Sequence, residues 1–292
     1  MSFFRVMKAE LVRSFIIMRR YWFRTITGMI IGYGMLMVLV AGFIYSRPGV
    51  ENAMDRFKDN PMGATNFILG FMIGMFAFGV VGMFTQGLQS MATTGVLEQL
   101  CMSPHGLATN FMAQTMVGSV TSIISSGIMV YAVTWSVSRG GSGMLHWDTL
   151  PILILLILTF FNLVGFGFMV GGLVLVFKQV GQVAILVRMG LFALAVFARE
   201  EMMHQPFPIP YMLHMLPITD ATIALKYVLI HNQMVSVGTT EAGEPIMQFS
   251  SVFFHSSFYW LLVSCIFWTF LGLFVFRFLE DYSRSKGTLG SY

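Results

Sequence analysis

This chain is dominated by long apolar runs, and they leave it few possible folds. A helix that crosses the hydrocarbon core of a bilayer needs about 20 predominantly apolar residues. Only 10% of the 292 residues are charged, whereas a soluble domain has about 25%. The runs are Trp22–Tyr45, Phe67–Leu88, Leu107–Val137, Thr149–Phe177, Val183–Ala198 and Ser256–Phe276. The sequence therefore predicts an all-α integral membrane protein with six transmembrane helices.

Two segments leave the number of spans open. The run Val183–Ala198 is short, and Ala221–Ile230 is apolar but too short to cross a bilayer alone. Five or seven spans are therefore alternatives to six. The longest polar stretch, Val235–Phe254, is too short to bury the core of a soluble domain. We therefore expect residues 1–292 to form a single membrane domain.

The distribution of basic residues predicts the orientation, because Lys and Arg near span ends are retained in the cytoplasm. With the amino terminus inside, the cytoplasmic segments hold Arg5, Lys8, Arg13, Arg19, Arg20, Arg24, Lys178, Arg188, Arg277, Arg284 and Lys286. Both termini are therefore expected in the cytoplasm, and the protein in the inner or plasma membrane of the cell. The net charge of +4 reflects this topology and does not indicate nucleic-acid binding.

The first 21 residues have the pattern of an amphipathic helix. An apolar stripe recurs at spacings of three and four, and basic residues lie away from it. The stripe is Phe4, Met7, Leu11, Phe15 and Met18, and the basic residues away from it are Arg5, Arg13 and Arg20. Lys8 is a further basic residue of this helix. We predict an interface helix that lies on the inner membrane surface in contact with lipid. Its basic residues either set the topology alone or also touch a cytoplasmic partner.

Prolines interrupt residues 199–235, before the last run. Pro206, Pro208, Pro210 and Pro217 prevent a continuous helix, while the apolar residues between them resist full exposure to water. A re-entrant hairpin in the outer leaflet satisfies both constraints. The same segment carries a soft-ligand set that could hold Cu(I) or simply fill space: Met202, Met203, His204, Met212, His214 and Met215.

The motifs of stand-alone catalysis and ATP binding are absent. None of the five lysines follows a glycine, so the phosphate-cradling pattern G-x-x-x-x-G-K-[ST] does not occur. The zinc-protease pattern H-E-x-x-H is also missing, and no metal site is predicted. We place no ionisable residue at the centre of a run, where an ion-coupled carrier usually needs one. The chain is therefore not expected to be an enzyme by itself.

Polar residues inside the runs are candidates for a substrate path, and small residues inside them are candidates for close packing of helices. Gln114, Ser122 and Asn162 could line a substrate path, with hydrogen bonds between helices as the alternative. Glycine pairs four residues apart, at 28 and 32, at 70 and 74, and at 167 and 171, predict close helix contacts, either within the chain or at a dimer seam.

One acid, Glu98, is the only charged residue between Asp59 and Arg139, and it lies between two apolar runs. A carboxylate at the centre of the bilayer would cost about 3 kcal/mol or more. The surrounding segment, residues 95–104 with the sequence GVLEQLCMSP, is therefore expected to form a short loop or helix at the membrane surface.

This segment resembles the first cytoplasmic loop of type-2 ABC exporter permeases, which carry a G-T-L-E-Q-L-x-x-[ST]-P-like stretch. The amphipathic start, the six-span layout, the proline-rich outer segment and residues 216–226, LPITDATIALK, are also similar to that family. Two positions depart from it. Residues 91–94 lack the charged residues that often precede the glycine, and Lys226 stands where an arginine is common.

The resemblance implies a permease domain whose coupling loop, residues 89–106, sits in a cleft of a separate ATPase subunit. The residues that would contact or bound this element are Gly95, Leu97, Glu98, Gln99, Leu100 and Pro104. ATP and Mg²⁺ would be bound by the ATPase, and this chain would hold no cofactor. The implied assembly is a dimer, either a homodimer or a paralogous heterodimer, that exports a drug, a lipid or another amphipathic molecule.

Two other classes of function are alternatives. A channel or an ion-coupled carrier would work without an ATPase, and its mark would be a buried ionisable residue. A membrane scaffold or sensor would form complexes without moving a substrate. Flux measured with and without the ATPase separates the three classes.

Overall fold

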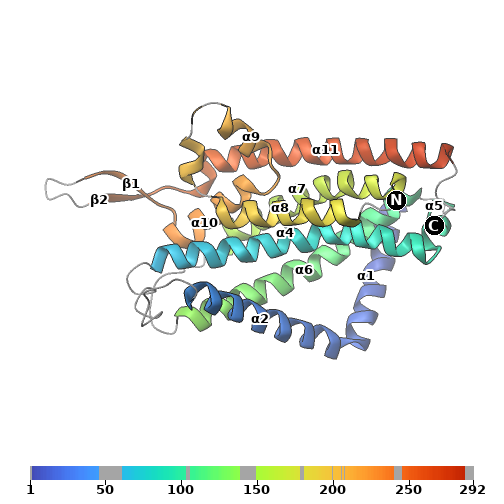
Figure 1. Cartoon of the computed structure of the whole chain (residues 1–292), viewed down its shortest axis with the longest axis horizontal. Coiled ribbons are helices and arrows are strands. Elements are labelled where there is room, and N and C mark those ends of the chain that lie inside the picture. The colour runs from blue at the N-terminus through green and yellow to red at the C-terminus, as the bar shows by residue number, and fades with distance from the viewer. Residues whose placement is uncertain are drawn as a thin grey trace.

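A computed structural model describes residues 2–45, 61–102, 106–138, 149–177, 181–198, 200–204, 206, 208–239 and 245–286. The chain is mainly helical in these ranges (Figure 1). Its α-helices are α1 (Ser2–Arg20), α2 (Trp22–Tyr45), α4 (Pro61–Thr93), α5 (Val96–Cys101), α6 (Gly106–Ser138), α7 (Thr149–Val176), α8 (Gly181–Phe197), α9 (Ile209–Met215), α10 (Thr219–His231) and α11 (Ser256–Ser285). Short 3-10 helices lie at Glu200–His204 and Val252–Phe254.

Three helices in the described ranges are long and apolar enough to cross a membrane. They comprise Asn66–Thr93 of α4, Leu150–Val176 of α7 and Ser256–Ser285 in α11. Shorter apolar helical stretches lie at Ile26–Met35 and Gln182–Phe197. A mainly helical membrane fold is therefore confirmed. The count of six spans and the re-entrant hairpin stay predictions.

The core lies where α7 packs along α11 and α4 packs along α8. Phe84 of α4, Phe111 of α6, and Phe168 of α7 are fully buried, and Phe84 meets the other two rings edge to face. Such pairs add about 0.5–1.5 kcal/mol beyond the area that they bury. These aromatic rings join α4, α6 and α7 at one level of the bundle.

Glycines allow these helices to approach closely. A Cβ atom at Gly70 would lie 2.7 Å from the Ala195 carbonyl oxygen, and one at Gly167 would lie 2.5 Å from the Phe84 ring. At these positions the glycines read from the sequence serve packing within the chain. The closest approach involves Gly272 of α11, where a Cβ atom would overlap the carbonyl oxygen of Gly165 in α7.

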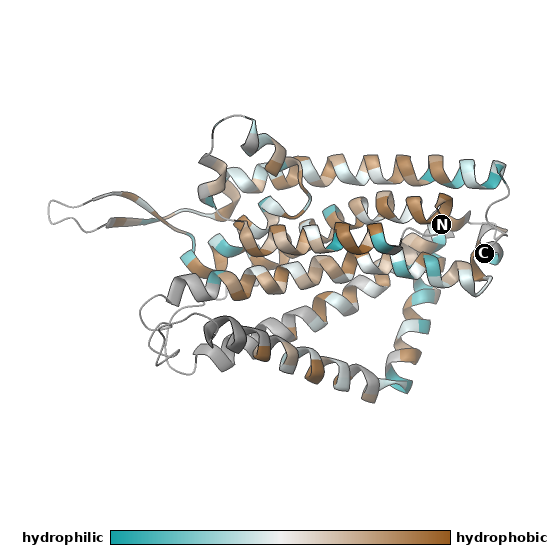
Figure 2. Cartoon of the chain, viewed as in Figure 1, coloured by the Kyte–Doolittle hydropathy of each residue, from teal (hydrophilic) through white to brown (hydrophobic). Residues whose placement is uncertain are grey.

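The helix α1 runs across the direction of the other helices and packs against α6 (Figure 1). Phe4, Leu11 and Phe15 are exposed on it. Figure 2 shows hydrophilic residues on α1 and at the end of the bundle where α5 lies. Mainly hydrophobic residues lie along the long helices of the bundle. This distribution is typical of a helix that lies on a membrane surface beside membrane-embedded helices.

A β-hairpin projects from the opposite end of the bundle (Figure 1). The strands β1 (Met234–Thr239) and β2 (Pro245–Phe249) are antiparallel and pair Met234 with Phe249. The register shifts between Ser236 and Gly238. No strand was predicted from the sequence. Every second residue of Met234–Thr239 is nevertheless β-branched, and such residues favour strands.

Candidate coupling site and buried polar groups

The end of α4 is built to turn the chain into α5. The backbone N–H groups of Thr94 and Gly95 donate to the carbonyls of Ser90 and Ala92, at 3.1 and 3.2 Å. Gly95 has φ +72°, a left-handed conformation that costs other residues about 1–2 kcal/mol. A glycine at this position therefore ends α4 and lets α5 begin one residue later.

The short helix α5 has one buried face and one exposed face. Leu97 is fully buried, and Leu100, three residues later, packs against the same core cluster. Val96 and Gln99 are exposed on the other side. The backbone of Glu98 lies within α5, its side chain falls outside the described part of the structure, and Pro104 lies outside the described residues. An apolar anchor thus holds α5 to the bundle while a second face stays open.

This arrangement links α5 mechanically to two long helices. The helices α4 and α6 have 33 residues each, and α5 packs against both of them. A displacement of α5 would therefore move the adjoining ends of α4 and α6 together as rigid bodies. The basic residues predicted for the interface helix, Arg5, Lys8, Arg13 and Arg20, are all exposed on α1.

Arg188 corrects one expectation from the sequence. It was counted with the cytoplasmic residues, and no ionisable residue was placed at the centre of a run. The structure places it eighth among the 17 residues of α8, with 5% of its surface exposed. Its Nε donates to the carbonyl of Phe78 at 3.0 Å. Position near the start of an apolar run did not reveal that the side chain turns toward α4.

Lys226 of α10 is a second buried cation, and its role is visible. Its Nζ donates to the carbonyl of Ala198 at 2.9 Å and to that of Ala195 at 3.4 Å. These are carbonyls at the end of α8, where helices lack partners for their last acceptors. A cation at this helix end also interacts favourably with the helix dipole. Lys226 therefore fastens α10 to α8.

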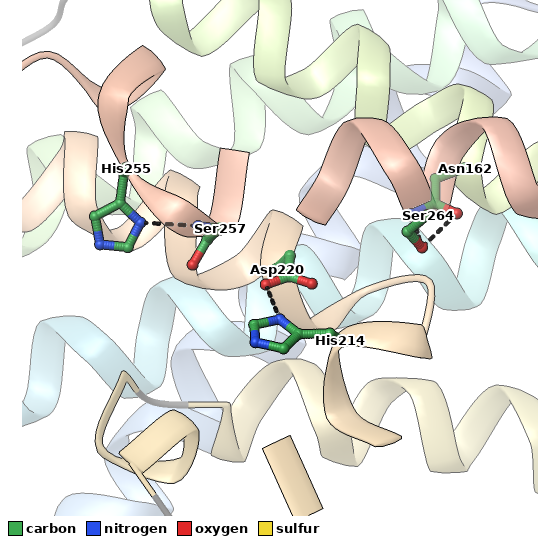
Figure 3. A network of polar contacts seen from close by, with 6 residues as sticks. All are labelled: Asn162, His214, Asp220, His255, Ser257 and Ser264. Carbon is green, nitrogen blue, oxygen red and sulfur yellow. Dashed lines mark hydrogen bonds and ion pairs between the residues drawn. The ribbon is translucent and has the colours of Figure 1, made fainter. Parts of the chain in front are cut away.

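A buried acid and a histidine pair in the proline-rich segment (Figure 3). Oδ1 of Asp220 lies 2.8 Å from Nδ1 of His214, and the His214 ring stacks on Trp260 with centroids 4.6 Å apart. Oδ2 of Asp220 and Oγ1 of Thr219 are buried without a hydrogen-bond partner in the described structure. Burial raises the pKa of Asp220 to about 8 and lowers the pKa of His214. At neutral pH the carboxyl is therefore mainly protonated and the imidazole neutral, so that one proton lies in the hydrogen bond between Asp220 and His214.

The comparison with known families decides the class of this chain. The model of the ABC-2 type transporter family matches residues 5–230, which is more than half of the sequence. The chain belongs to the ABC-2 type transporter family. No curated protein matches the chain significantly.

The ABC-2 match covers α1 to α10 and ends before the hairpin and α11. It includes α5 and both of the buried charged residues of α10, Asp220 and Lys226. The chain is accordingly a membrane-spanning permease subunit of a transporter, and the resemblance drawn from the loop around Glu98 is confirmed.

The predicted path residues of this permease lie in different surroundings. Gln114 and Ser122 are half-buried on α6. Asn162 of α7 is buried, and its Nδ2 donates to Oγ of Ser264 in α11 at 3.1 Å (Figure 3). That bond joins two helices of the core, the alternative raised for these residues. A role for the three residues in a substrate path stays a prediction.

The described histidine and methionine side chains near α9 lie in different surroundings, and the His204 side chain falls outside the described part of the structure. Met212 and Met215 are exposed, while His214 is engaged by Asp220. Among the described residues, no group of three or more His, Cys, Asp or Glu side chains could hold a metal ion. His255 instead begins α11, where its Nδ1 accepts from the Ser257 N–H at 3.2 Å (Figure 3).

The pair of Asp220 and His214 predicts a pH dependence of stability. The folded protein keeps a proton on Asp220 up to about pH 8, whereas the ordinary pKa of this carboxyl is 3.8. Stability is therefore lost as pH rises through about 8, by about 1.4 kcal/mol between pH 7 and pH 9. His214, whose pKa is lowered from 6.5, stays neutral in this window.

The substitution Asp220→Asn should remove that loss, because an amide donates to His214 Nδ1 at every pH. We expect a flat melting temperature from pH 7 to pH 9 for purified Asp220→Asn, against a decline for the wild type. Asp281→Asn, at an exposed acid of α11, should decline like the wild type. An equal decline in Asp220→Asn would contradict the assignment of the proton.

Proposed function

We propose that this permease is the membrane-spanning subunit of an ATP-driven exporter that acts as a dimer and is driven by a separate ATPase. The two-faced helix α5 carries the proposal. Leu97 and Leu100 bind it to the core, while Val96 and Gln99 face outward. In a chain of the ABC-2 family, the open face is where an external subunit can push.

The proposed mechanism assigns no chemistry to this chain. The partner ATPase binds ATP and Mg²⁺ and changes shape on closure. Its contact with Glu98, Gln99 and the ends of the element at Gly95 and Pro104 displaces α5. Because Leu97 is buried between α4 and α6, those helices follow. Opposing permeases then alternate between inward-open and outward-open states.

The proposed cargo is apolar or amphipathic, such as a drug or a lipid. The helices α4, α6 and α7 carry no Asp or Glu at all, so their surfaces suit apolar groups. With the amino terminus inside, α1 and α5 would lie at the cytoplasmic side of the cell inner or plasma membrane, in reach of a soluble ATPase.

One observation favours a second candidate. Asp220 and Arg188 are ionisable and buried, and buried ionisable groups are typical of ion-coupled carriers. Asp220 already shares a proton with His214, and in principle that proton could be exchanged. An ion-coupled carrier would work without an ATPase.

Reconstitution separates these proposals. The chain should co-purify from native membranes with an ABC ATPase, and proteoliposomes should move an amphipathic probe only when chain, ATPase and ATP are all present. Flux that follows a pH gradient, without ATPase or ATP, would favour the carrier. A stable complex that hydrolyses ATP but moves no member of a panel of amphipaths would favour a scaffold and contradict export.

A further inference from the structure

Arg188 is held in a fixed position on the contact between α4 and α8. Its Nε donates to the Phe78 carbonyl at 3.0 Å, and its Cζ lies 3.7 Å from the centroid of the Phe78 ring. The hydrogen bond sets one edge of the planar guanidinium, and the ring covers one face by a cation–π contact. On the remaining edge, Nη2 lies next to Gly82 of α4.

The helix α4 has a glycine where the guanidinium passes. A Cβ atom at Gly82 would lie 2.5 Å from Nη2 and 2.8 Å from Cζ of Arg188. Any larger residue at position 82 would push the guanidinium away from Phe78. The cation therefore occupies a space that the backbone of α4 leaves open for it.

No acid neutralises this cation in the described structure. Arg188 makes no ion pair there, and Nη1 and Nη2 have no hydrogen-bond acceptor. The helices α4, α6, α7 and α8 contain no Asp or Glu, and Asp220 of α10 is engaged by His214. An arginine stays charged at any physiological pH. A buried charge without a counter-ion is costly and marks a ligand path by default.

A comparison with Lys226, the other buried cation, shows that Arg188 has fewer partners than a buried cation of this chain can have. The Lys226 ammonium reaches two carbonyls at the end of α8, Ala198 and Ala195, which account for its position. Arg188 has one carbonyl and a ring, and two of its three nitrogens are left for something else. Within the described part of the chain, Arg188 therefore has no anionic partner.

The surface beside Arg188 is apolar with a small polar part. On α4, Gly79 and Gln86 lie one turn before and after Gly82 and are exposed. On α8, Ile185 and Met189 are exposed at 47% and 58%. An apolar chain fits such a surface, and a Cβ atom at Gly79 would meet nothing within 4 Å.

We propose that Arg188 binds the anionic headgroup of an amphipathic ligand whose apolar tail lies along the exposed face of α4 and α8. This proposal deepens the exporter function and rests on it for the identity of the ligand as cargo. The headgroup chemistry is a phosphate or a similar oxyanion, because a guanidinium edge offers parallel N–H donors to such groups. The cargo class narrows from amphipathic to anionic amphipathic.

The test compares two probes with the same tail on the purified permease without any ATPase. The probes are 1-palmitoyl lysophosphatidic acid and 1-monopalmitoylglycerol, which differ by the phosphate. We expect Arg188→Gln to weaken binding of the phosphate probe by about tenfold or more and to leave the neutral probe unchanged. Arg188→Lys should lie between Arg188→Gln and the wild type. Lys226→Gln, which lowers stability, should keep the wild-type preference.

Equal affinity of wild type and Arg188→Gln for the phosphate probe, in protein that elutes as one folded species, would overturn the proposal. Should Arg188→Gln fail to fold, an absence of any wild-type preference for the phosphate probe would overturn it equally. If inorganic phosphate alone competes with the phosphate probe, the natural ligand of Arg188 is a free anion. Co-purified phosphatidylglycerol that the phosphate probe displaces identifies a resident lipid, and ATP-driven flux of the probe identifies cargo. Because binding is measured without ATPase, failure of the coupling mechanism leaves this result intact.

Discussion

Gly272→Val is expected to eliminate nearly all folded protein. A Cβ atom at Gly272 would overlap the Gly165 carbonyl oxygen, and one at Gly165 would lie 2.5 Å from the Trp268 carbonyl. The obstacles are backbone atoms, so no side chain can rotate away. Overpacking typically costs 1–3 kcal/mol, and separating two helix backbones should cost about 3 kcal/mol or more. Total stabilities of about 5–15 kcal/mol leave little margin for that loss.

The measurement is the monodisperse fraction and the melting temperature of a fluorescent fusion of the full chain. Gly190→Val is the matched control, because a Cβ atom at Gly190 of α8 meets nothing within 4 Å. The control should express and melt like the wild type. A monodisperse Gly272→Val protein with an unchanged melting temperature would show that α7 and α11 do not pack this closely.

Leu97→Asp should uncouple the permease from its ATPase. The side chain of Leu97 is fully buried on the inner face of α5. A carboxylate at this position would have no partner. Replacing a buried leucine by alanine already costs about 2–5 kcal/mol, and an unpaired charge costs more. The six-residue helix α5 has little else to hold it. We therefore expect α5 to detach while the bundle stays folded.

The readout is the transport of an amphipathic probe by the permease with its ATPase. Transport by Leu97→Asp should fall at least about tenfold, which is the effect of about 1.4 kcal/mol, while α-helix content persists. Leu97→Met conserves volume and should retain most of the activity. Wild-type transport by Leu97→Asp would mean that the position of α5 does not matter for coupling.

The class of the fold was predictable because the bilayer sets the length of a spanning helix and excludes charged residues from its centre. The loop around Glu98 was predictable for the same reason, since an acid between two apolar runs must reach the surface. The spacing of Leu97 and Leu100 by three residues also agrees with one buried face of α5. In these cases one local stretch of sequence contains the information.

Contacts between distant segments were not predictable in this way. Gly165 and Gly272 meet across helices that are far apart in the sequence, and no local pattern pairs them. Arg188 was counted with the basic residues of the cytoplasmic segments, whereas its partner Phe78 lies 110 residues away in the sequence. The pair of His214 and Asp220 was not predicted, because the sequence does not show that the end of α9 folds back onto the start of α10.

The central claim is that a separate ATPase drives this permease through α5, and Glu98→Ala in the reconstituted pair tests it most directly. The quantity to measure is the amount of probe moved per ATP hydrolysed, together with the yield of the complex. Glu10→Ala is the control, because Glu10 is an acid of α1 rather than of α5. Its Oε1 lies 3.1 Å from Nη1 of Arg13. The account predicts that Glu98→Ala lowers the complex yield or the probe moved per ATP, and that Glu10→Ala changes neither. Unchanged complex formation and unchanged transport-coupled hydrolysis in Glu98→Ala would contradict it.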